Sequence, residues 1–276
     1  MKFNTLLLVS GALLVALVSK GCSEGGGVNM FSIEDDLALG AQMAAEIASN
    51  PETYPILDSL TYAEAYKHIY AIRNTILASG AVYHQDAFPW QIKIINDDAV
   101  QNAFCTPGGY IYVYTGLIKY LEDESQLAGV IGHEMAHADL RHSTDQLTKA
   151  YGISFLIGII LGNKENLIAD VVASLTQLAF SRSDEEQADA YSVNYLCPTH
   201  YVASGSAGFF EKIESEDESD IMEFLSTHPN PKNRVSNIRK MAAGLPCEGG
   251  QLFEARYKTF IATLPKTKPG LTQFNH

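Results

Sequence analysis

The chain has 276 residues, enough for one large domain with a buried core or for one domain and a short appendage. Its formal net charge of −13 gives no electrostatic basis for binding nucleic acid. Its hydrophobic content of 46% is ordinary for a globular protein.

The first 31 residues are predicted to be an export signal and a tether. Residues 6–18 form an apolar run of 13 residues, which suits a signal peptide and is too short for a typical membrane span. The run leads into "VSKGC", which resembles a bacterial lipoprotein signal with Cys22 as the lipid-modified first residue. An ordinary secretory signal cut nearby is the alternative, because Lys20 and Ser19 depart from the lipoprotein pattern. We expect a signal peptide over 1–21, a flexible tether over 22–31 and a single domain over 32–276.

The next segments predict two helices and then a β section. Ser32 is a suitable N-cap for the first helix, and Asn50-Pro51 separates it from a second amphipathic helix that stops at Gly80. The stretches "WQIKIIND" and "NAFCTPGGYIYVYTGLI" read as strands. Alternation places Ile111 and Val113 on one face of the second stretch, and it places three tyrosines on the other face, Tyr110, Tyr112 and Tyr114.

The rest of the chain reads mainly as helix. Helices are expected near 117–121, 124–142, 146–161, 166–180, 184–196, 207–214 and 231–243. The apolar stretch "YGISFLIGIILG" is too short to span a membrane, and burial in the core is favoured over a membrane-facing patch. Cys197 and Cys247 lie in loop-like contexts and could pair, because an exported chain permits disulfide bonds, but the sequence leaves the connectivity of Cys105, Cys197 and Cys247 open.

The stretch "GVIGHEMAHADLRHS" contains His133-Glu134-x-x-His137, which is typical of a zinc hydrolase helix. Residues four apart lie on one face of a helix, so both imidazoles can bind one Zn²⁺ while Glu134 reaches a water molecule. A histidine pair that merely packs in a buried helix is the alternative. A catalytic zinc site also needs a third protein ligand.

The third ligand is expected on another helix. The metzincin pattern would need glycine and histidine where Leu140 and Ser143 stand, and His142 is expected to point away near the helix end. Downstream, Glu185 and Asp189 are four apart and share a face. We assign Glu185 as the ligand and Asp189 as the acceptor that orients His133 from behind.

His228 in "STHPNPKNR" leaves three roles open. It can be a fourth, exchangeable ligand, a hydrogen-bond donor in the transition state, or a plain turn residue.

Four motifs in this order resemble the HtpX/CAAX-protease-type zinc metallopeptidases, and more narrowly their periplasmic, lipoprotein-like bacterial members. These motifs are "HEMAH", "SRSDEEQAD", "NAFCTPGGYIYVYTGL" and "THPNPKNR", and the similarity runs from about Ser32 to about Met241. Cys105 departs from the family, which commonly has a small apolar residue there.

The resemblance implies a gluzincin-type fold of the α+β class, mainly helical, with a small antiparallel sheet beside the HExxH helix. It implies one Zn²⁺ per chain on His133, His137 and Glu185, and it makes His228 and Arg234 candidates for auxiliary catalytic residues. It also makes the strand after Pro107 an edge strand for substrate, through Gly109, Tyr110, Ile111 and Tyr112.

The expected activity is endoproteolysis of unfolded or misassembled envelope proteins, with Glu134 as the general base. The chain would be exported to the periplasm and anchored to a membrane through lipid on Cys22. The rival class is a non-proteolytic, zinc-stabilised chaperone or envelope assembly factor. An exopeptidase ranks lower, because no motif for gripping a free terminus is recognised.

Overall fold

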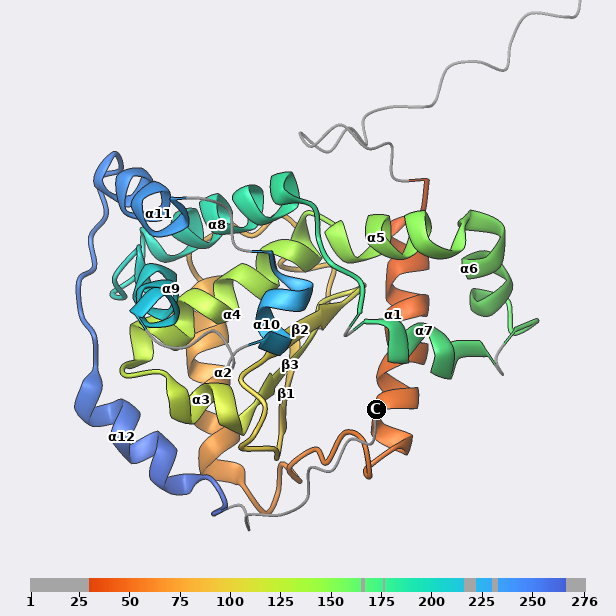
Figure 1. Ribbon diagram of the computed structural model, residues 1–276, viewed down its shortest axis with the longest axis horizontal. Helices are drawn as coiled ribbons and strands as arrows, with labels where there is room; N and C mark the ends of the chain where they lie inside the picture. The colour runs from red at the N-terminus through yellow and green to blue at the C-terminus, as the bar shows by residue number, and fades with distance from the viewer. Residues whose placement is uncertain (1–29, 165–166, 176, 216–221, 230–232, 267–276) are drawn as a thin grey trace, which may run out of the picture.

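The computed structural model describes residues 30–164, 167–175, 177–215, 222–229 and 233–266 (Figure 1). The predicted signal peptide and almost all of the predicted tether lie outside these residues. The expected class is confirmed, because helices of the described chain surround one small three-stranded sheet.

The sheet is mixed, where a purely antiparallel one was expected. Its strands are β1 (Gln91–Ile95), β2 (Ala103–Thr106) and β3 (Tyr110–Tyr114), in the order β1-β3-β2. β2 pairs antiparallel with β3 through a tight turn in which Gly108 and Gly109 adopt positive φ angles of 74° and 82°. β1 runs parallel to β3, because the chain crosses over to place β2 on the far edge.

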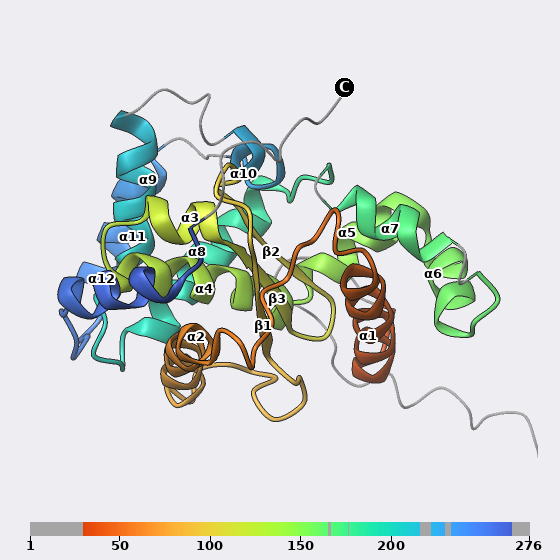
Figure 2. The same cartoon turned by 90° about the horizontal axis from the view of Figure 1, so that it is seen from below.

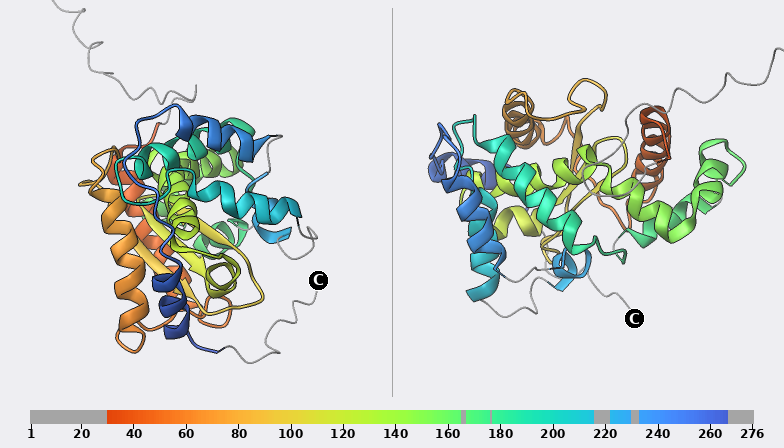
Figure 3. Two further views of the ribbon diagram at one scale, coloured as in Figure 1. Left: turned by 90° about the vertical axis from the view of Figure 1, so that its left-hand side faces the viewer. Right: turned by 90° about the horizontal axis from the view of Figure 1, so that it is seen from above.

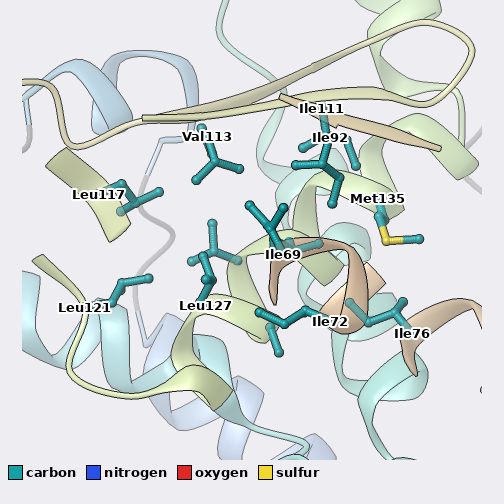
Figure 4. Packing of buried hydrophobic residues seen from close by; sticks show 14 of the residues in the cluster. Ile69, Ile72, Ile76, Ile92, Ile111, Val113, Leu117, Leu121, Leu127 and Met135 are labelled. Carbon is teal, nitrogen blue, oxygen red and sulfur yellow. The ribbon is translucent and has the colours of Figure 1, made fainter. Parts of the chain in front are cut away.

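The two faces of the sheet pack against different helices, as the alternation predicted. Ile111 and Val113 join the core formed with α2 (Ala63–Leu77) and α4 (Glu124–Asp139), which Figure 4 shows from close by. Tyr112 and Tyr114 face the second cluster, which includes buried residues of α1 (Ile33–Ser49). Ser32 caps α1 in a capping box with Asp35, which confirms the predicted start of this helix.

The remaining helices gather at two ends of the molecule. α5 (His142–Tyr151), α6 (Ile153–Ile160) and α7 (Ile168–Ser174) lie with α1 at one end (Figures 1 and 2). α9 (Gly205–Ser215), α11 (Arg234–Ala243) and α12 (Glu254–Thr263) lie at the other end. α8 (Arg182–Leu196) runs beside α4, as the view from above in Figure 3 shows, while α3 (Thr115–Tyr120) and α10 (Met222–Thr227) are short.

Several predicted helices are shorter or divided. The expected helix over 146–161 is two helices, α5 and α6, because Gly152 adopts a φ of 80° between them. α6 is only partly buried: Leu156 and Ile159 face the core, but Ile157 is 40% exposed. The expected burial of this apolar stretch is therefore only half correct. Among the described residues, none of the helices has the length and apolar character to cross a membrane.

A disulfide bond joins Cys197 at the end of α8 to Cys247, the pairing that the sequence allowed but did not fix. The bond ties the segment that leads to α12 back to the helix that carries Glu185. Cys105 is a free, buried thiol on β2.

Candidate metal centre

The helix α4 carries the first three residues of the site. Asp123 caps it by accepting a hydrogen bond from the Gln126 N–H at 2.9 Å, which fixes where the helix starts. His133 and His137 then lie on one face. A Cβ on Gly129 would come within 2.2 Å of the Ser206 backbone nitrogen. The glycine at this position thus serves the close packing of α4 against the start of α9.

The helix α8 brings Glu185 to the same point from the other side. Its capping box is formed by Ser181 and Asp184, which fixes where the helix starts. This start places Glu185 and Asp189 on one buried face.

His228 follows α10 and completes the cluster. Its ring is fully buried and stacks on Phe224, with ring centroids 4.6 Å apart. Its Nδ1 lies 2.9 Å from Glu185 Oε1, and its Nε2 lies 3.5 Å from Glu134 Oε1. The role as a plain turn residue is therefore not supported.

Four side chains converge closely enough to hold one metal ion. One ligand atom from each of His133, His137, Glu185 and His228 lies within 4.8 Å of the others. The His133 and His137 Nε2 atoms are 3.0 Å apart, and His137 Nε2 is 3.2 Å from Glu185 Oε1. Tetrahedral zinc, with bonds of roughly 2.0–2.2 Å, keeps its ligand atoms about 3.3 Å apart.

The chemistry of the cluster also fits zinc. Both Glu134 carboxylate oxygens and His228 Nε2 are buried without a hydrogen-bond partner among the described residues. Buried polar atoms without partners are costly unless an ion or water satisfies them. Nitrogen and carboxylate ligands are the set that zinc accepts in hydrolases.

A layer of charged side chains holds the ligands from behind. Asp189 Oδ1 lies 3.0 Å from His133 Nδ1, as expected for an acceptor that fixes the ring. Arg234 donates two hydrogen bonds of 2.7 Å to Asp189, and its Nη2 lies 2.9 Å from Glu185 Oε2. Arg234 also lies over the Phe210 ring and is 1% exposed. The structure places Arg234 behind the ligands, where it braces them; its expected role as an auxiliary residue of the site stays a prediction.

Burial and charge set the protonation of the site. Burial raises the pKa of Glu134 above its usual value, although His228 and His133 oppose the shift. A carboxylate with a raised pKa is a stronger base. Burial alone would also raise the pKa of Glu185, but the neighbouring histidines lower it well below its usual value.

Three residues of the site were not expected from the sequence. Phe180 stacks on His137 with ring centroids 3.8 Å apart. The Cys105 thiol lies against Glu134, and burial together with that charge raises the thiol pKa well above normal. His142 is buried with its Nδ1 3.1 Å from His137 Nδ1, so the expectation that it points away is wrong. α4 ends at Asp139, and the chain turns before His142, so helical spacing no longer applies.

The expected substrate strand is central in the sheet. β3 is paired on both sides, so no peptide can add to it, and the proposed strand addition through Gly109, Tyr110, Ile111 and Tyr112 is wrong. Within the described chain, β2 pairs only with β3 and therefore forms one edge of the sheet. The Tyr114 N–H donates to the Asn102 carbonyl, so alternation turns the backbone N–H groups of Ala103 and Cys105 away from β3.

Known proteins match this chain over most of its described length. A model of Peptidase family M48 matches residues 69–242, more than half of the chain. Mitochondrial metalloendopeptidase OMA1 of Arabidopsis thaliana is 32% identical over 158 residues, 57% of this chain and 32% of that protein. Metalloprotease YcaL of Escherichia coli (strain K12) is 26% identical over 256 residues, 87% of this chain and 99% of that protein.

A fourth match is the Beta-barrel assembly-enhancing protease of Yersinia pestis. It is 25% identical over 229 residues, 77% of this chain and 45% of that protein. The chain thus spans less than half of this protein and of OMA1, and nearly all of YcaL.

Proposed function

Because this chain belongs to Peptidase family M48, we propose that it is a zinc-dependent endopeptidase that cleaves unfolded or misassembled proteins of the bacterial envelope. The resemblance to zinc metallopeptidases is confirmed by the family match, while the relatives named above do not single out the HtpX-type group. The observation that carries the proposal is the convergence of two histidines, a glutamate and a third histidine beside the buried Glu134.

The residues of the site divide into ligands, base and supports. His133, His137 and Glu185 would hold the zinc ion, with His228 as the exchangeable fourth ligand. A bound zinc ion supplies a Lewis acid that polarises the scissile carbonyl and lowers the pKa of water. Glu134 takes the proton of the attacking water and passes it to the leaving amine nitrogen.

The edge strand β2 is the place where we propose that a peptide binds. An extended peptide would pair with the outward N–H groups of Ala103 and Cys105, which are 0% and 3% exposed, so its binding requires the chain over this edge to move aside. Cys105 lies against Glu134, so a peptide on this edge passes close to the base. Pairing through the main chain depends little on the side chains of the peptide, which suits substrates that differ in sequence but share an unfolded state.

Envelope location and a membrane anchor belong to the same proposal. They are supported by the apolar run before Cys22 and by the relative whose name describes β-barrel assembly. The lipid would be carried by Cys22, which lies outside the described residues.

The proposal is tested with Glu134→Gln. This variant should bind zinc like the parent but cleave unfolded casein about 10²–10⁴-fold more slowly, the usual loss for a general base. Glu186→Gln on the exposed face of α8 is the matched control and should cleave normally. Normal turnover by Glu134→Gln would contradict the mechanism. A parent that binds zinc and prevents aggregation without cleaving anything would favour the chaperone alternative.

A further inference from the structure

His133 and His137 differ in the group that contacts the Nδ1 of each ring, on the side away from the metal site. His133 faces a carboxylate, Asp189, which is itself held by Arg234. His137 faces another histidine, His142, whose Nδ1 lies 3.1 Å from His137 Nδ1. The two rings meet at 70° and both are buried, so this contact is shielded from water.

The direction of this hydrogen bond follows from the ligand set. His137 Nε2 is the nitrogen that faces the cluster, at 3.2 Å from Glu185 Oε1. A nitrogen that binds a metal carries no proton, so the proton of a neutral His137 sits on Nδ1. The only hydrogen bond that fits is from His137 Nδ1–H to a bare Nδ1 on His142. His142 then carries its own proton on Nε2, on the side of Asp184.

The position of His142 is set by the turn at Arg141, which is held by hydrogen bonds to Asp36 of α1. Arg141 adopts a left-handed conformation with a φ of 64°, and this brings the first residue of α5 back beside α4. Asp36 of α1 is 1% exposed and binds both sides of the turn. It accepts a hydrogen bond of 2.5 Å from Arg141 Nε and one of 2.8 Å from Thr144 Oγ1. A left-handed arginine is unfavourable by itself, so these contacts hold the turn.

We infer that His142 is a positioning residue that fixes the tautomer and orientation of His137, and that Asp36 acts through it. The inference rests on the proposed metal site. Hydrogen bonds behind a liganding histidine orient the ring and raise its basicity, and their loss typically weakens metal binding 10–100-fold. His142 accepts the hydrogen bond from His137, as Asp189 accepts the one from His133. The acceptor is a neutral imidazole behind His137 and a carboxylate behind His133.

Zinc affinity in the Glu134→Gln background tests this inference, because the readout is competition with a chelator and needs no turnover. His142→Phe keeps the ring volume and loses the acceptor, so it should bind zinc about 10–100-fold more weakly. His142→Asn places an amide oxygen near the former Nδ1 and should recover most of the affinity. His68→Phe removes another largely buried histidine, next to Glu124, and should leave zinc affinity unchanged.

Asp36→Asn tests the second part of the inference, that Asp36 acts through His142. It weakens the anchor of the turn, so it should lower zinc affinity by a smaller factor than His142→Phe does. Combined with His142→Phe it should add no further loss, because residues that act in one chain are not additive. Should His142→Phe not fold, His142→Leu and Asp36→Asn carry the same test.

Each outcome bears on a different claim. If the Glu134→Gln protein binds no zinc, the metal site itself is wrong. If it binds zinc and His142→Phe or His142→Leu binds equally well, the positioning role is wrong. If Asp36→Asn and His142→Phe lower the affinity independently, Asp36 does not act through His142.

Discussion

At the scale of single residues, the buried charges around His133 depend on one another. Arg234 is a permanently charged, buried side chain that contacts both Asp189 and Glu185. Breaking a buried ion pair leaves a charge without compensation, which costs far more than an exposed pair contributes.

Arg234→Ala should therefore lower the free energy of unfolding of the metal-free protein by about 3–5 kcal/mol. Arg234→Lys should recover only part of this loss, because a lysine cannot donate two parallel hydrogen bonds to Asp189. Urea denaturation in the presence of a chelator measures both. Arg239→Ala, which breaks an exposed pair with Glu211, serves as control and should cost at most about 1 kcal/mol. Equal losses at positions 234 and 239 would contradict the bracing role.

The sequence revealed those site residues whose spacing lies within one helix. His133 and His137 are four apart on α4, as are Glu185 and Asp189 on α8, so a face could be assigned to each pair. His142 and Cys105 could not be found in this way. Their places depend on a left-handed Arg141 and on the pairing of β2, and neither has a local signal.

At the scale of elements, β2 is the strand on which we propose that a substrate binds, and all four of its residues are buried in the free protein. The N–H of Ala103 points away from β3, whereas Phe104 exchanges hydrogen bonds with Tyr112 in the sheet. A proline is tolerated on an edge strand where its missing N–H faces outward.

Ala103→Pro should therefore fold and keep its kcat but raise KM for an unfolded substrate several-fold, because one main-chain bond to the peptide is lost. Phe104→Pro is the matched control, and it should lower the melting temperature instead by breaking the ladder. Steady-state kinetics and thermal unfolding separate the two effects. An unchanged KM in Ala103→Pro would remove β2 from the peptide-binding site.

The docking of α12 provides an element-scale test of pH dependence. Glu124 at the start of α4 is buried, and it pairs with Arg256 of α12, His68 and Tyr201. Burial raises its pKa, but these hydrogen bonds outweigh burial and lower the pKa from 4.5 to about 2. The folded state thus binds the Glu124 proton less readily than the unfolded chain. Its contribution to stability is complete above pH 4.5 and is lost as the pH falls to about 2.

Glu124→Gln should accordingly be less stable than the parent at pH 6, with a gap that closes between pH 4.5 and 2. Melting temperatures of the two metal-free proteins across this range measure the gap. Glu64→Gln, from an exposed pair with Lys67, should follow the parent at every pH. A gap that stays constant would show that Glu124 does not stabilise the protein through its charge.

The elements themselves were predicted unevenly. Long amphipathic helices such as α1, α2, α4 and α8 were found because their apolar residues repeat at spacings of three and four. α10 and α12 were missed, because α10 has only six residues and α12 buries only Tyr257 and Phe260, too few for a clear helical repeat. The parallel pairing of β1 was missed because strand order depends on the crossover between strands, which periodicity does not reveal.

At the scale of the whole molecule, the Cys197–Cys247 bond joins the metal centre to the C-terminal part of the chain. The two cysteines are 50 residues apart, and the loop between them contains His228, Arg234 and α11. Closing a loop of this length limits the unfolded chain and typically stabilises a protein by about 2–4 kcal/mol.

The double variant Cys197→Ser with Cys247→Ser should therefore unfold at a lower urea concentration than the parent, by about 2–4 kcal/mol in free energy. Reducing agent should bring the parent to the same midpoint and leave the variant unchanged, because Cys105 has no disulfide partner in the structure. A parent that is insensitive to reducing agent, with a midpoint equal to that of the variant, would show that the bond contributes nothing.

Under the proposed export, the same bond sets the order in which the centre is completed. His133 and His137 leave the ribosome long before His228, Arg234 and Cys247 are made. The loop that carries the later residues closes only where thiols can oxidise, which the reducing cytosol prevents. The brace on Asp189 and Glu185 is thus the last part of the centre to be secured. Under the proposed export, the loop would close after transport, so the complete centre would form outside the cytosol.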